Sequence, residues 1–198
     1  IDKKTLANLK IKCITLKHPN IRQKMTYAEE LDYIVSKESR NKFILDLCET
    51  LNGNTLCLFQ LVEKHGKVLY DGMKGSENVY FVYGGTDTEQ RERIRGLVEG
   101  HRKSTTIASY GTFSTGINIR NINNIVLASP SKSKIRVLQS IGRGLRTSST
   151  KDSILVFDIA DDISYGERRN FTLNHFFERL NIYNEEEFNY EISKVKIK

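Results

Sequence analysis

The side chains best suited to chemistry lie in residues 139–146, where Gln139, Arg143 and Arg146 follow the pattern Q-x-x-G-R-x-x-R. Their spacing of four and then three residues places all three on one face of a helix. A guanidinium stays charged and offers a planar fork of donors to phosphate oxygens. Two guanidiniums aimed at one point suit the charge that develops in phosphoryl transfer. Two arginines alone are more often part of a solvated basic helix face.

A helix over residues 133–146 is predicted to carry these side chains. The segment contains no proline and consists largely of good helix formers. Gly142 lies between the glutamine and the arginines, and the missing side chain lets another backbone come close. The sequence therefore predicts a rigid basic element with room for close packing beside it.

A second polar group follows the apolar residues 105–108. Ser109 and Thr112 supply hydroxyls in a glycine-containing turn that continues to Gly116 and Asn118. In open α/β sheets, ligands and especially phosphates bind at the carboxyl ends of parallel strands. The pattern therefore predicts ligand binding at the end of this strand.

The order of these segments resembles a known family. A strand at 105–108, a hydroxyl-rich turn, a strand at 124–130 and the arginine helix resemble the fifth and sixth motifs of superfamily-two helicases. Residues 54–66 look like the fourth motif, and residues 82–93 look like the strand-to-helix element that follows it. All four occur in the family's order, which makes the resemblance specific.

The resemblance implies the second RecA-like motor domain of such a helicase. Its ATP would bind between two motor domains, with Arg146 serving the transition-state charge, Arg143 the γ-phosphate and Gln139 the orientation of the cleft. Other ATP contacts would come from Gly116, Asn118 and Gly142. The implied DNA contacts are Gln60, Lys64, Gly84, Gly85, Ser109 and Thr112. Taken alone, Gln60 is more often a structural side chain. The two glycines equally serve a tight turn alone.

Two motifs of a complete motor are missing from the sequence. There is no G-x-x-x-x-G-K-[ST] loop and no D-E-x-x acidic motif to hold a triphosphate and Mg²⁺. This chain alone is therefore expected to be inactive. The cofactor, ATP with Mg²⁺, would be bound mainly by a first motor domain, which we expect to precede Ile1 in a longer polypeptide.

Within the superfamily, residues 59–67 and 108–116 resemble phage recombination helicases, as does the lead-in at 26–41. This implies an enzyme that remodels branched DNA by fork regression, branch migration and R-loop unwinding, in recombination and repair. Its partners would be branched or single-stranded DNA and RNA–DNA hybrids. Three alternatives remain: the translocating subunit of a restriction system, a nucleic-acid-binding module without ATPase activity, and a generic doubly wound domain.

Strands alternate with helices along the chain, which predicts an α/β domain with a mainly parallel sheet covered on both faces. This is the RecA-like three-layer α/β/α arrangement, with ligand chemistry at the carboxyl ends of the strands. We divide the chain into a basic linker with an edge strand (1–24) and the RecA-like domain (25–198). Two helices are expected within 26–51, a helix at 61–71, a helix at 165–183 and a last strand at 188–197.

The chain is basic, and its positive charge is concentrated near the N-terminus. The 198 residues carry a formal charge of +7, which fits a polyanionic partner. Most of it lies before residue 25, where a single aspartate faces seven cations: Lys3, Lys4, Lys10, Lys12, Lys17, Arg22 and Lys24.

The cysteines, histidines and apolar runs of the sequence indicate no disulfide, metal site or membrane span. The three cysteines lack metal or disulfide spacing, which favours reduced, buried thiols in the cytoplasm, or the host cytoplasm for a phage protein. No apolar run reaches the ~20 residues of a membrane span, so no membrane partner is expected. Histidine spacing indicates no metal site. Asp158, Asp161 and Asp162 suit turns and helix caps or, less simply, a metal.

Overall fold

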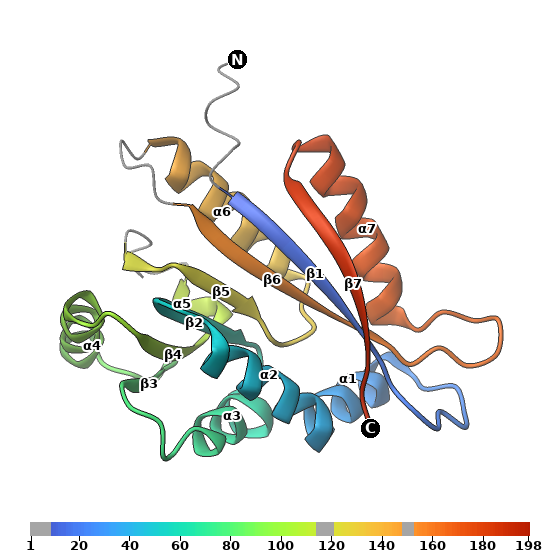
Figure 1. Ribbon diagram of the computed structural model, residues 1–198. Coiled ribbons are helices and arrows are strands. Elements are labelled where there is room, and N and C mark those ends of the chain that lie inside the picture. The colour runs from blue at the N-terminus through green and yellow to red at the C-terminus, as the bar shows by residue number, and fades with distance from the viewer. Residues whose placement is uncertain (1–8, 114–120, 148–152) are drawn as a thin grey trace.

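The computed structural model describes residues 9–113, 121–147 and 153–198, with the backbone alone for 143–147. Its sheet has seven strands in the order β3-β4-β2-β5-β6-β1-β7, and every described pair is parallel (Figure 1). The strands are β1 (Leu9–Lys17), β2 (Asn54–Phe59), β3 (Val79–Val82), β4 (Ser104–Ser109), β5 (Asn124–Leu127), β6 (Ile154–Asp162) and β7 (Asn189–Lys196). The predicted parallel α/β sheet is confirmed.

Helices cover both faces of this sheet. Their bounds are α1 (Tyr27–Ser36), α2 (Glu38–Thr50), η2 (Val62–Gly66), α3 (Lys67–Gly72), α4 (Thr88–Gly100), α5 (Tyr110–Phe113), α6 (Ser133–Thr147) and α7 (Phe171–Glu185). One core cluster joins the strands to α4, α5, α6 and α7, and the other joins them to α2 and α3. The central strands β2 and β5 are buried along their whole length, as expected for parallel strands covered on both sides.

Local signals explain most helix boundaries. Thr26 forms a capping box with Glu29 and begins α1. The side chain of Asp87 accepts from the Gln90 N–H and begins α4. The two helices expected within 26–51 are confirmed. The helix expected from residue 61 starts as the π-helical turn η2, which continues into α3.

The last helix begins later than predicted, at Phe171 rather than Tyr165. Residues 165–168 form a tight turn instead. The buried carboxylate of Glu30 accepts the N–H groups of Phe171 (3.0 Å) and Thr172 (2.7 Å). Because a carboxylate at a helix N-terminus satisfies otherwise unpaired donors, Glu30 from α1 fixes where α7 starts.

The predicted edge strand near the N-terminus is wrong in its position. β1 pairs with β6 on one side and β7 on the other, so it is an interior strand and not a linker. The sheet therefore includes residues on both sides of position 24. Lys10 and Lys12 gave β1 the look of an edge, but they lie on one face and contact Glu191 of β7 at 3.9 and 3.7 Å.

Two aspartates of β6 are buried ion-pair partners, so the expectation of turns and caps is wrong for them. Asp158 accepts hydrogen bonds from Lys134 of α6 (3.0 Å), Arg179 of α7 (2.9 Å) and Tyr183 of α7 (2.6 Å). Burial alone would raise the pKa of Asp158, but the charges of Arg179 and Lys134 hold it below its ordinary range. The strand therefore anchors α6 and α7 to one face of the sheet.

Asp161 does the same for the opposite layer. The guanidinium of Arg40 in α2 donates to both of its oxygens, at 2.7 and 2.9 Å, and His18 Nε2 lies 2.7 Å from Oδ1. Burial would raise the pKa of Asp161, and Arg40 and His18 lower it below its ordinary range. Asp162 fits the turn expectation, because it accepts from the Ser164 N–H at 3.0 Å.

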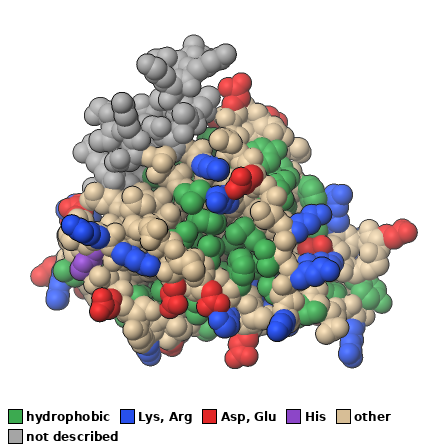
Figure 2. All heavy atoms as spheres, viewed as in Figure 1, with side chains coloured by type: hydrophobic (Ala, Val, Ile, Leu, Met, Phe, Trp, Pro, Cys, Tyr) green, Lys and Arg blue, Asp and Glu red, His purple; other side chains and the backbone are tan. Residues whose placement is uncertain are grey.

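Part of the sheet is left uncovered on the face that carries α2. Figure 2 shows hydrophobic side chains gathered at the middle of this face. Half-buried apolar side chains that pack against the second core cluster include Ile14, Phe43, Leu47, Leu155 and Val195.

Among the described helices, none is long and apolar enough to cross a membrane.

We predict that Asp161→Asn lowers the free energy of unfolding by about 3–5 kcal/mol, because it leaves the buried Arg40 charge without its carboxylate. Asp46→Asn is the matched control, since Asp46 forms an exposed ion pair with Lys42 that contributes about 0.5 kcal/mol. Urea denaturation measures both variants. Equal losses would show that the buried pair does not hold α2 to the sheet.

Candidate functional site

Most of the predicted DNA contacts lie along one edge of the sheet. Gln60 follows β2, Gly84 and Gly85 follow β3, and Ser109 ends β4. These three strands are neighbours in the order β3-β4-β2 and all run in the same direction. Their carboxyl ends therefore bring the predicted residues together from separate parts of the sequence.

The hydroxyl turn is folded into the short helix α5. Ser109 Oγ lies 2.5 Å from Thr112 Oγ1. Ser109 is half-buried and Thr112 is buried, so Ser109 offers the more accessible hydroxyl. Thr112 is positioned to orient the Ser109 hydroxyl.

Gln60 is exposed and held at two points. Its backbone N–H donates to Ser129 Oγ at 3.0 Å, and its Oε1 accepts from Ser131 Oγ at 2.9 Å. Lys64 is also exposed and pairs with Asp32 of α1 at 2.7 Å. Such a surface pair contributes at most about 1 kcal/mol, so a phosphate can replace Asp32 at little cost.

The glycine turn is closed by Arg91, whose guanidinium donates to the carbonyl oxygens of Thr86 (2.8 Å), Gly84 (3.1 Å) and Tyr83 (3.2 Å). A Cβ on Gly85 would lie 2.6 Å from the Tyr83 ring, whereas a Cβ on Gly84 would meet open space. A side chain at Gly85 would therefore displace the Tyr83 ring, and Gly84 is the position with open space beside the backbone.

A buried hydrogen-bond chain behind Gln60 was not predicted. The Asn41 amide donates to the Val35 carbonyl oxygen at 2.9 Å, and its Oδ1 lies 3.0 Å from His65 Nε2. His65 Nδ1 lies 2.6 Å from Ser129 Oγ, which accepts the Gln60 N–H. Because Asn41 Oδ1 can only accept, we assign the proton to His65 Nε2, and the Ser129 hydroxyl donates to Nδ1.

These hydrogen bonds require a neutral His65 ring, because Nδ1 accepts the Ser129 hydroxyl. Burial and the charge of Arg40 lower the pKa of His65 to about 3, although Asp161 acts in the opposite direction. Ser129 also accepts the Tyr110 hydroxyl at its carbonyl oxygen, at 2.8 Å. One buried serine therefore holds both the segment that follows β2 and the segment that follows β4.

The helix that carries the arginine motif, α6, extends from the carboxyl edge of the sheet to the amino edge. α6 follows the carboxyl end of β5, where buried Lys134 fixes it to Asp158, and its 15 residues span about 21 Å. Burial lowers the pKa of Lys134 to about 8, and Asp158 opposes this shift. The helix runs back along the sheet and ends beside the start of β6 (Figure 1). The end of α6 that carries the backbone of Arg143 and Arg146 therefore lies towards the amino edge of the sheet.

Of the six predicted nucleotide contacts, the structure describes two in full, Gln139 and Gly142. Gln139 and Gly142 are half-buried, and a Cβ on Gly142 would meet the Phe188 ring at 3.4 Å, an ordinary contact. The close neighbour of Gly142 is thus a side chain of the same chain. The side chains of Arg143 and Arg146, and the residues Gly116 and Asn118, lie outside the described residues, so their roles remain predictions.

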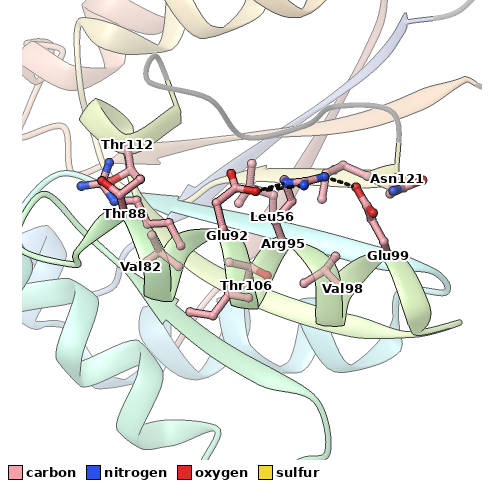
Figure 3. Close-up of a pocket in the computed structure, with 13 residues that line it drawn as sticks. Leu56, Val82, Thr88, Glu92, Arg95, Val98, Glu99, Thr106, Thr112 and Asn121 are labelled. Atoms are coloured by element: carbon pink, nitrogen blue, oxygen red, sulfur yellow. Dashed lines mark hydrogen bonds and ion pairs between the residues drawn. The ribbon is translucent and has the colours of Figure 1, made fainter.

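A cavity of about 180 Å³ lies between α4 and the sheet, next to Thr112. Figure 3 shows Arg95 between Glu92 and Glu99 of α4, which it pairs with at 2.9 and 2.6 Å. The Oγ1 of Thr106 is buried without a hydrogen-bond partner among the described residues.

Across all the residues that the structure describes, no group of three His, Cys, Asp or Glu side chains comes close enough to hold a metal ion.

The sequence matches the model of the Helicase conserved C-terminal domain over residues 35–148. The chain belongs to this family. It is 36% identical, over 97% of its own length, to the ATP-dependent DNA helicase uvsW of Enterobacteria phage T4. It is also 34% identical, over 41% of its length, to the putative ATP-dependent helicase IRC3 of Saccharomyces cerevisiae, of which that segment covers 12%. The chain spans 42% of the T4 protein and thus less than half of it.

Solved structures agree with this assignment. The crystal structure of T4 UvsW has a TM-score of 0.81 and 36% identity over 96% of this chain and 42% of that one. The C-terminal domain of the DEAD-box protein Dbp5 has a TM-score of 0.61 at 14% identity, over 94% of this chain and 90% of that one, and it shows the shared fold alone. The predicted superfamily-two, RecA-like motor domain is confirmed.

We predict that stability falls when the pH drops from 7 to 5 because His65 is buried as a neutral group. Its folded pKa lies below the unfolded value of about 6.5, so the unfolded chain binds more protons; full stability exists above pH 6.5 and is lost towards pH 3. The loss at pH 5 is about 2 kcal/mol.

Urea denaturation at both pH values tests this prediction. His65→Asn removes the titrating group, so its stability should change by less than about 0.5 kcal/mol over the same pH range. His175→Asn, at a half-buried ring, is the control and should behave as the wild type. An unchanged pH dependence in His65→Asn would contradict the neutral buried imidazole.

Proposed function

We propose that this chain is the second motor domain of an ATP-dependent DNA helicase that remodels branched DNA in recombination and repair. The activities would be fork regression, branch migration and unwinding of R-loops. The observation that carries the proposal is the 36% identity to a DNA helicase over 97% of the chain. The first RecA-like domain would belong to the same polypeptide, and the protein would act in the cytoplasm, or in the host cytoplasm if a phage encodes it.

In this proposal the end of α6 faces the nucleotide. Arg146 stabilises the charge of the transition state, Arg143 contacts the γ-phosphate, and Gln139 orients the cleft, with Gly116, Asn118 and Gly142 beside it. Such arginines accelerate phosphoryl transfer by ~10³ to 10⁵, equivalent to about 4–7 kcal/mol. Mg²⁺ would be held mainly by the first motor domain and would neutralise the charge on the phosphates.

The carboxyl edge would hold one DNA strand by its backbone. Ser109, with Thr112 behind it, and Gln60 offer polar groups to phosphate, Lys64 offers a positive charge, and the turn at Gly84 and Gly85 lets the backbone approach. Contacts of this kind fix position without reading sequence. They suit a motor that must move along any strand.

A continuous physical connection joins the two edges. Ser131 donates to Gln60 and accepts the Ser133 N–H at 3.0 Å, which places the start of α6 against a proposed DNA contact. The other end of the same helix carries the arginines. A shift of α6 when the cleft opens would therefore move Gln60 as well, and this would couple hydrolysis to translocation.

We expect Arg146→Ala and Arg143→Ala in the full-length protein to lower DNA-stimulated ATP hydrolysis by about three decades, because each removes a guanidinium that stabilises the transition state. Filter binding of ATP and of DNA, run alongside, should change little. Arg136→Ala is the control, an exposed arginine nearer the start of the same helix, and it should retain hydrolysis. Unchanged hydrolysis in the first two variants would favour a binding module without ATPase activity.

A further inference from the structure

A basic groove at the carboxyl edge lies outside the motifs discussed so far. It has a volume of about 320 Å³ and lies between the loop that follows β1 and the loop that follows β6, at the right of Figure 1. Its lining residues include Lys24, Tyr165, Arg168, Arg169 and Phe171. β6 is two strands from β2, which corresponds to about 10 Å between the strands. The groove therefore lies on the same edge of the sheet as Gln60.

One wall of the groove is a tight hairpin turn. The backbones of Tyr165 and Arg168 exchange two hydrogen bonds of 3.2 Å, and Gly166 has a φ of +61°, which favours glycine. Tyr165 is 48% exposed at the base of this turn. A large aromatic side chain is thus held at the surface by a short, hydrogen-bonded backbone.

A second exposed aromatic ring lines the groove. Phe171, the first residue of α7, is 47% exposed. Its ring packs edge-on against Tyr27 of α1, with centroids 5.9 Å apart. Glu30 fixes the backbone at this point, so Phe171 has a defined position from which one ring face can meet a ligand.

The charge of the groove is unbalanced. Lys24 and Arg168 are exposed, and their side chains have no carboxylate partner among the described residues. The Arg169 guanidinium lies 4.3 Å from the centroid of the Phe177 ring rather than on an acid. The lining carboxylate is Glu30, and the N-terminus of α7 already occupies it. An anionic partner would therefore find three cations not neutralised by neighbouring acids.

We propose that this groove binds a single-stranded segment of DNA, as a second contact beyond the edge formed by β3, β4 and β2. Unpaired bases stack on exposed aromatic rings, and their phosphates meet arginine and lysine, which is the combination found here. The inference rests on the proposed function, because it extends the DNA path of that motor. A duplex would offer phosphates to the cations but no free base face to Tyr165 and Phe171.

The test uses the full-length protein and a fluorescein-labelled 20-nucleotide oligothymidylate, followed by anisotropy across a salt series. Arg168→Gln combined with Arg169→Gln should weaken binding about tenfold and reduce the salt slope by about 1.4, since each lost phosphate contact on a single strand contributes about 0.7. Tyr165→Ala should weaken binding at least about fivefold, whereas Tyr165→Phe should stay within about twofold of the wild type.

The charge control is Arg102→Gln combined with Lys103→Gln. It removes an adjacent exposed pair of cations just before β4, at the opposite edge of the sheet, and should leave the salt slope unchanged. If the groove variants match this control while DNA still stimulates ATP hydrolysis, the groove inference is wrong and the proposed function stands. If they lose duplex binding as strongly as single-strand binding, with Tyr165→Ala silent, the single-strand assignment is overturned.

The proposed function can also fail while the groove inference stands. Should DNA not stimulate ATP hydrolysis by the wild type, the proposed function fails. The oligothymidylate measurement still decides the groove, because loss of binding in the Arg168 and Arg169 double variant, and not in the control, supports it independently of hydrolysis.

Discussion

The fold depends on two buried carboxylates of one strand. Asp158 and Asp161 lie three residues apart on β6, so they point to opposite faces of the sheet. Asp158 ties α6 and α7 to one face, and Asp161 ties α2 to the other. Removing either carboxylate leaves a buried cation unpaired, which costs far more than losing a surface ion pair. The strand therefore fixes where both helix layers sit.

One of these ion pairs connects to the edge that we propose binds DNA. Arg40 Nη2, besides pairing with Asp161, donates to the Ala128 carbonyl oxygen at 2.7 Å. The next residue, Ser129, holds Gln60, His65 and Tyr110. A polar network thus extends from the carboxyl end of β6 to the ends of β2 and β4. Functional sites need such support, because a side chain acts reproducibly only when its surroundings fix it.

Sequence patterns predicted the fold class, most elements and the residues along the carboxyl edge. Helical and strand periods are local properties, and the family motifs fix which turns carry polar groups. The edge position of β1 was predicted wrongly, because a strand with one lysine-bearing face gives the same alternation as an edge strand. Gly85 shows another limit: only the structure reveals that its close neighbour is Tyr83.

The buried polar pairs could not be predicted from the sequence, for a different reason. Aspartate, arginine and lysine are mostly surface residues, so sequence reasoning places them there. Arg40 and Asp161 are separated by 121 positions, and no local pattern connects them. The His65 chain likewise joins four elements. The placement of α6 was predictable in principle, because a helix that follows a parallel strand runs back towards the amino edge.

The central claim is that DNA and nucleotide contact opposite edges of this domain, joined by α6. Hydrogen exchange of the full-length protein measures this directly, with oligothymidylate alone and with a non-hydrolysable ATP analogue alone. The account predicts that DNA protects residues 60–66 and 109–113, and that the nucleotide protects residues 139–147. Protection of residues 139–147 by DNA alone, with residues 109–113 protected by the nucleotide instead, would contradict it.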